Sequence, residues 1–216
     1  MNLATAPGRG EDAVDRVSPE TALAWSDLFL CLGRAWLPPP AGLSAADWCG
    51  PLADDLDDLG TELGLDVQAA TAALRDEAGK SEARDPWLVV YSRLFLVPPV
   101  PVTLNTGIYL EGALGGNASQ MMQACYRVAG FEQDLRFRDL PDHAAMQLEF
   151  LGALFERGAR GDPDAVGQAR EFLAGFVDHW AEPLRKACER AVPSHAEAKT
   201  FAELARVVES ALATLA

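Results

Sequence analysis

The chain has 216 residues, 49% of them hydrophobic and 23% charged, which is the composition of an ordinary soluble globular protein. A net charge of −14 argues against binding to nucleic acid or to anionic membrane surfaces, because both contacts depend on Lys and Arg. The acidity is explained by solubility alone, or by attraction to a basic partner such as a peptide with exposed arginines.

The four cysteines are scattered, and no pair has the Cys-x-x-Cys spacing of zinc or thioredoxin-type sites. A reducing cytoplasm is therefore the expected compartment. No stretch approaches the roughly 20 apolar residues of a membrane span, and the N-terminus lacks the apolar core of a signal peptide. Residues 1–17, rich in Ala, Gly, Pro and charge, are expected to form a flexible tail ahead of one domain over 18–216.

Capping residues and prolines divide the first part of that domain into helices. Ser18, followed by a proline, caps a helix that ends before the prolines at 38–40. Ser44 and Asp47 start a second helix, which carries leucines at helical spacing over a strongly acidic opposite face. Asp66 caps a third helix that runs through Ala78.

A short amphipathic helix begins after Pro86, and its apolar face carries three aromatic residues, Trp87, Tyr91 and Phe95, before a proline-rich segment. Pro98, Pro99 and Pro101 force extended backbone, so helix is excluded from about residue 97 to 106. This segment is predicted to be an ordered loop or a short edge strand. The aromatic residues of the helix are explained by core packing, or by a wall against which a peptide binds.

The second half of the chain shows further helix starts. One helix is predicted over 118–128, and Pro141 opens another that runs through Phe155. A third runs from Asp162-Pro163 to about residue 180, where Pro183 ends or kinks it, and a Ser-x-x-Glu capping box at 194–197 precedes a last helix to about 215. No strand pattern occurs. The sequence therefore predicts a single all-α domain of about eight to ten helices.

Asp142 and His143 are the strongest candidates for chemistry, because they fall in the first turn of the helix that Pro141 opens. Glu149 does not share a helix face with His143, and no second histidine is near enough to complete a metal site. The glycines at 112–116 lack a P-loop lysine. The pair is explained by a structural role at the helix start or by binding, and a small helical nucleotide-binding protein or enzyme that uses His143 with Asp142 is the alternative.

Four motifs in order resemble the TorD/DmsD/NarJ family of molybdoenzyme maturation chaperones. The resemblance covers roughly residues 20–190 and is closest to chaperones of dimethyl-sulfoxide-reductase-type enzymes. Two departures stand out: Leu96-Val97-Pro98 replaces a usual Gly-Pro, and Gly107 stands where the family commonly has Ser. The motifs are Arg34-Ala35-Trp36-Leu37-Pro38-Pro39; Tyr91-Ser92-Arg93-Leu94-Phe95 with the later Gly107-Ile108-Tyr109; Leu140-Pro141-Asp142-His143 with Leu148-Glu149-Phe150; and His179-Trp180 before Pro183.

The resemblance implies an all-helical, TorD-like, non-enzymatic chaperone in the cytoplasm. Its partner would be the catalytic subunit of an apo-molybdoenzyme, whose twin-arginine leader it binds so that export waits until molybdopterin is inserted. The resemblance implies no resident cofactor or metal, allows a transient contact with molybdopterin or weak binding of guanine nucleotide, and implies a monomer or a domain-swapped dimer. A permanent assembly subunit of a larger oxidoreductase is a further alternative. The residues expected to bind the leader are Trp87, Tyr91, Leu94, Phe95, Pro98, Tyr109, Asp142, His143 and Glu149.

Overall fold

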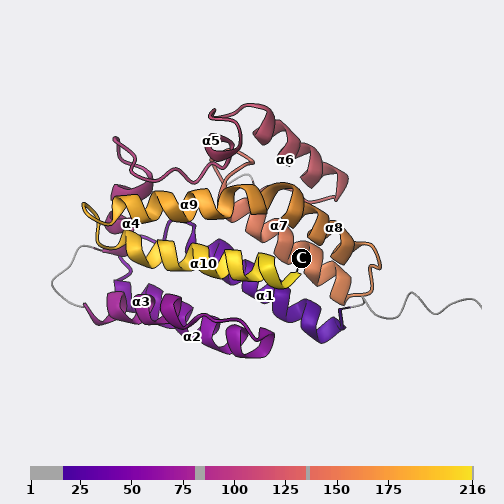
Figure 1. The fold of residues 1–216 in the computed structure, drawn as a ribbon, viewed down its shortest axis with the longest axis horizontal. Coiled ribbons are helices and arrows are strands. Elements are labelled where there is room, and N and C mark those ends of the chain that lie inside the picture. The colour runs from indigo at the N-terminus through magenta and orange to yellow at the C-terminus, as the bar shows by residue number, and fades with distance from the viewer. Residues whose placement is uncertain (1–16, 81–85, 135–136, 216) are drawn as a thin grey trace, which may run out of the picture.

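The computed structural model describes residues 17–80, 86–134 and 137–215, and within these ranges it contains helices and no strand (Figure 1). The predicted all-α class is confirmed. The tail expected over 1–17 lies, apart from Val17, outside the described residues. The elements are α1 (Pro19–Ala35), α2 (Ala45–Leu63), α3 (Gln68–Gly79), α4 (Trp87–Phe95), α5 (Gly107–Leu110), α6 (Asn117–Val128), α7 (Ala144–Ala159), α8 (Ala165–Phe172), the π-helix η1 (Leu173–Val177), α9 (Asp178–Ala191) and α10 (Ala198–Leu215).

The helices pack as neighbouring pairs around one core. In Figure 1, α9 and α10 run side by side across α1 and α7, the pair α2 and α3 lies along one edge, and α5 and α6 cover the opposite edge. The closest packing joins α1 to α7, where a Cβ on Gly152 would come within 2.8 Å of the Leu30 side chain. A glycine is therefore required there, because it lets the two helices approach each other.

Local capping explains where the first helices begin. The Ser18 hydroxyl accepts the backbone N–H of Thr21 at 3.1 Å, as expected of an N-cap. At the start of α2, the Ser44 hydroxyl accepts the N–H of Asp47 at 3.1 Å, and the Asp47 carboxylate accepts the Ser44 N–H at 3.3 Å. This reciprocal capping box confirms the start predicted from the sequence.

Three predicted helix boundaries are wrong. Helix α7 begins at Ala144, so Asp142 and His143 precede its first turn, and the His143 side chain caps it. Pro183 lies inside α9 and does not end it. Because proline has no backbone N–H, the carbonyl oxygen of His179 lacks its helical donor. His179 is exposed, so water can donate a hydrogen bond to that oxygen instead. Helix α10 begins at Ala198, three residues later than the predicted capping box requires.

The proline-rich segment before α5 is an ordered loop, which was one of the two predicted alternatives. Its first part is exposed and apolar, whereas Val102 and Leu104 are buried in the core. Asn105 forms an isolated antiparallel bridge with His143, and the N–H of Ala144 donates to the Leu104 carbonyl at 2.8 Å. The loop is thereby attached to the start of α7, which brings two of the family-like motifs together.

Candidate binding site

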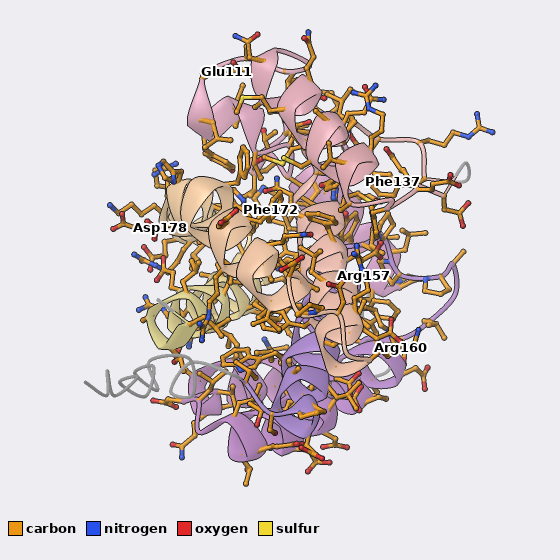
Figure 2. All side chains as sticks on the ribbon, turned by 90° about the vertical axis from the view of Figure 1, so that its right-hand side faces the viewer. Glu111, Phe137, Arg157, Arg160, Phe172 and Asp178 are labelled. Carbon is orange, nitrogen blue, oxygen red and sulfur yellow. The ribbon has the colours of Figure 1, made fainter. Side chains whose placement is uncertain are left out.

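A pocket of about 540 Å³ opens where the end of α1, the start of α7 and the connection between α6 and α7 meet. Met146 and Glu149 are three residues apart on α7, so both side chains project from the same face of that helix. Phe137 reaches the pocket from the connection before α7 (Figure 2). The lining residues are Leu37, Phe131, Glu132, Asp134, Phe137, Met146 and Glu149.

The electrostatics of this pocket favour a cation. Glu149 is half-buried among apolar side chains, and burial raises the pKa of its carboxyl group, with a further contribution from the negative charge of Asp134. A raised pKa means that the ionised carboxylate is destabilised in the free protein. An arriving cation would relieve that destabilisation, and apolar Leu37, Phe131 and Met146 would contact the less polar parts of the same ligand.

His143 supports the wall of the pocket from inside. Its Nδ1 accepts the N–H of Ala145 at 3.2 Å, and its ring meets the ring of Phe137 edge-on at 5.3 Å. Only 3% of the residue is exposed, and burial lowers the pKa of the imidazole to about 4. His143 is therefore neutral near pH 7 and acts as a helix cap that positions Phe137.

Asp142 points away from this pocket into the molecule. Its side chain is 0% exposed, Oδ2 accepts the N–H of Gly107 at 2.8 Å, and Oδ1 has no hydrogen-bond partner among the described residues. Burial raises the pKa of the carboxyl group, against the opposing effect of the Gly107 hydrogen bond. Asp142 thus joins α5 to the start of α7 and does not reach the surface.

The structure explains one departure from the family pattern. A Cβ at position 107 would lie 2.7 Å from Oδ2 of Asp142 and 2.9 Å from the carbonyl oxygen of Ala113. No side chain fits between these two oxygens, so glycine is required where a serine is common.

A buried polar network continues behind Asp142. Its carbonyl oxygen accepts the hydroxyl of Thr106 at 3.0 Å and the side-chain amide of Gln147 at 3.0 Å. The carbonyl oxygen of the same side chain, Oε1 of Gln147, accepts the indole N–H of Trp180 at 2.8 Å. These bonds connect α5, α7 and α9 in the interior, where unpaired polar groups would be costly.

The predicted residues of α4 lie in the core and do not line the pocket. Trp87 stacks on Phe201 of α10 at 6.0 Å, Phe95 meets Phe201 edge-on at 4.8 Å, and Tyr91 contacts Phe95 at 4.8 Å. Leu94 is also buried. The aromatic residues of α4 were explained either by core packing or by a peptide-binding wall, and their burial agrees with core packing.

Tyr91 nevertheless connects to the pocket through one hydrogen bond. Its hydroxyl donates to the carbonyl oxygen of Trp36 at 3.0 Å, at the end of α1, and the next residue, Leu37, lines the pocket. Tyr109, in contrast, is half-buried, and its hydroxyl donates to the Thr103 carbonyl at 2.7 Å. Pro98 is exposed on the loop after α4.

Most of the residues that line the pocket were not predicted from the sequence. Phe131, Glu132 and Asp134 follow the helix predicted over 118–128, and Phe137 comes shortly after them. Aromatic and acidic residues alternating in a short connection were the available signal. Of the predicted leader-binding residues, only Glu149 lines the pocket. The buried ring of His143 contacts Phe137, which also lines it.

Three further observations concern the described residues as a whole. No three His, Cys, Asp or Glu side chains among them come together as a metal site would require. None of the described helices combines the length and the apolar character needed to cross a membrane. All four cysteines, Cys31, Cys49, Cys125 and Cys188, are free.

Comparison with known proteins agrees with this architecture. The fold resembles the crystal structure of a candidate redox enzyme maturation protein from Archaeoglobus fulgidus, with a TM-score of 0.50 and 20% sequence identity over 92% of this chain and 97% of that one. No curated protein matches the sequence. The model of the family described as nitrate reductase delta subunit matches residues 58–186, more than half of the chain. This protein therefore belongs to the nitrate reductase delta subunit family, the NarJ/TorD-type family of redox enzyme maturation chaperones.

Proposed function

We propose that this protein is a cytoplasmic chaperone that binds the twin-arginine leader of an apo-molybdoenzyme catalytic subunit, assists insertion of molybdopterin and delays export until assembly is complete. It acts by binding and release and catalyses no reaction. Membership of the family supports the maturation role. We add to that role the binding of a leader, whose two arginines would enter the pocket that contains Glu149.

The observation that carries the proposal is the half-buried carboxylate of Glu149 inside a partly aromatic pocket. An arginine side chain suits such a site, since its planar guanidinium is weakly hydrated, stacks on aromatic rings and binds carboxylates with two hydrogen bonds. Phe131 and Phe137 offer the rings, while Glu132 and Asp134 add negative charge at the same pocket. The apolar stretch that follows the arginines would lie over the neighbouring surface.

Such a site predicts moderate affinity. Burial of a few apolar side chains contributes roughly 1.5–3 kcal/mol each, and the ordering of a flexible leader subtracts from that sum. A dissociation constant of about 1 μM is therefore expected. That value suits a chaperone that must release its client.

Isothermal titration calorimetry with a synthetic twin-arginine leader tests the proposal. Glu149→Gln removes the half-buried charge and is expected to weaken binding about tenfold, the usual effect of losing a charge-assisted hydrogen bond. Glu156→Gln is the matched control, because it removes the same charge from the same helix outside the pocket, where Glu156 pairs with Arg160. Absence of leader binding, or equal loss in both variants, would contradict the assignment.

A further inference from the structure

A second, mainly apolar groove lies on another face of the molecule, between α6 and the continuous helix formed by α8 and η1. Its volume is about 520 Å³, within the range of about 300–1,000 Å³ found for ligand pockets. Glu171 is the only charged residue among its described lining. Phe172, which is labelled in Figure 2, is the last residue of α8. The lining residues are Ala124, Cys125, Val128, Ala129, Phe150, Leu154, Gln168, Glu171, Phe172 and Phe176.

Helix α6 has a second apolar stripe, whose two ends are exposed and whose middle residue is half-buried. Its inner face buries Met122 and Tyr126 in the core. A separate stripe carries Met121, Cys125 and Val128 at helical spacing i, i+4, i+7, and Met121 and Val128 are 52% and 89% exposed. Exposed apolar surface of this kind marks an interaction site more often than a single exposed residue does.

The opposite wall is built on a π-helix. Residues Leu173–Val177 adopt this rare geometry, which occurs frequently at functional sites. Phe172 packs edge-on against Phe150 of α7 at 4.9 Å and lies 5.0 Å from the half-buried ring of Phe176. The rings form a firm apolar wall facing the stripe on α6, so the groove is already formed without a ligand.

Charge indicates which partner the groove accepts. A second copy of this chain would bring another net charge of −14 to the interface, and the repulsion disfavours self-association. Glu171 is exposed at the groove and would pair with a cation on the partner. The negative net charge and the exposed Glu171 both favour a basic amphipathic segment as the partner.

We propose that this α6–α8 groove binds an amphipathic helix of the client enzyme, separate from its leader, with apolar side chains at i, i+3, i+4 and i+7 and Lys or Arg beside them. The proposal rests on the proposed maturation function and adds a second, helix-recognising surface to it. Helix-in-groove binding uses this spacing, since one face of the incoming helix inserts between two walls. The chaperone would thereby hold a folding segment of the client body while the leader occupies the other pocket.

The test uses the full-length protein and a synthetic helical peptide. The probe has about 18 residues, enough for partial helicity, with Leu along one stripe, Lys on the remaining face and no Arg-Arg pair. A control peptide has the same composition with its leucines distributed around the helix. Calorimetry is expected to show binding of the probe about tenfold tighter than of the control peptide, because only the probe presents one continuous apolar face.

Matched variants locate the binding. Val128→Lys removes an apolar contact and places a positive charge that repels the Lys-rich probe, so it is expected to weaken probe binding about tenfold or more. Leu23→Lys adds the same charge at an exposed leucine of α1 and is expected to leave binding unchanged. Bound probe should also slow alkylation of Cys125, measured by peptide mass mapping, relative to Cys31. Both thiols are half-buried, and only Cys125 lines the groove.

The outcomes separate this inference from the proposed function. Equal loss in the two variants, equal affinity for both peptides, or a homodimer that Val128→Lys dissociates would overturn the groove assignment. Glu149→Gln is expected to leave probe binding intact, since the probe lacks the twin arginines. Probe binding without any leader binding would refute the leader proposal alone, and leader binding without probe binding would refute the groove alone.

Discussion

At the scale of single residues, a helix cap and a pocket wall depend on the same histidine. His143 accepts the N–H of Ala145 and packs against Phe137, so its imidazole must stay neutral to serve as an acceptor through Nδ1. Burial enforces this by lowering its pKa to about 4. The sequence pointed to His143 as a candidate for chemistry, and the structure gives it a positioning role.

The lowered pKa of His143 predicts a specific pH dependence of stability. Between its ordinary value of 6.5 and its folded value of about 4, the unfolded chain binds a proton that the folded chain excludes. Stability contributed by His143 is therefore present above pH 6.5 and declines as pH falls toward 4, by up to about 1.4 kcal/mol per pH unit. Urea unfolding across this range should show the decline in the wild type and a flatter profile in His143→Asn.

Asn is a suitable replacement because it caps helices and does not titrate. The raised pKa values of Asp142 and Glu149 have the opposite effect, because they increase stability as the pH falls. Both carboxyl groups are present in the wild type and in His143→Asn, so their effect cancels in the comparison. His179→Asn, at an exposed position, serves as the control and should keep the wild-type slope. Parallel profiles for His143→Asn and the wild type would show that His143 titrates normally when folded.

At the scale of elements, the short helix α5 is tied to the start of α7. Thr106 donates both its backbone N–H and its hydroxyl to the Asp142 carbonyl, and the Gly107 N–H donates to the Asp142 carboxylate. A helix of four residues has little stability of its own, so these tertiary hydrogen bonds determine its position.

Gly107→Ala tests how tightly α5 is seated. The added methyl group would meet Oδ2 of Asp142 and the backbone oxygen of Ala113, and it should destabilise the protein by about 1–3 kcal/mol, as overpacking usually does. The urea midpoint should fall without a change in the slope m. Gly167→Ala, in α8 with open space around its Cβ position, is expected to be neutral or stabilising. Similar stability of the two variants would show that α5 shifts easily.

At the scale of the whole molecule, the net charge of −14 acts on association more than on the fold. Acidic residues extend over much of the surface, including the exposed face of α2. A cationic leader would be attracted over distances comparable to the Debye length, about 8 Å at physiological salt. Short-range contacts in the pocket would then set the dissociation rate of the leader.

Leader binding should therefore depend on salt mainly through its association rate. Raising the ionic strength from about 0.01 M to about 0.15 M should slow association by about tenfold and change dissociation much less. Stopped-flow fluorescence of a labelled leader measures both rates. A leader with both arginines replaced by glutamine should lose most of the salt effect. A salt-independent association rate for the natural leader would refute electrostatic attraction as the route to binding.

The fold class and most helix starts follow from the sequence because they depend on local interactions. Ser18 and Ser44 bond to amides three residues away, and the apolar stripes of α1 and α2 repeat within a few turns. The continuation of α9 through Pro183 was not predictable in the same way, since it depends on whether the surroundings tolerate one missing hydrogen bond.

The sequence by itself determined an all-helical chain with the order of motifs typical of its family, because capping, periodicity and motif order are properties of neighbouring residues. Only the tertiary structure decided which of those residues line a pocket and which lie in the interior. It turned Asp142 and the aromatic residues of α4 inward, and it assembled the pocket from Leu37, Phe131, Glu132, Asp134, Phe137, Met146 and Glu149. The physical reason is that a pocket forms from side chains distant in sequence, whose meeting depends on how α1 and α7 pack.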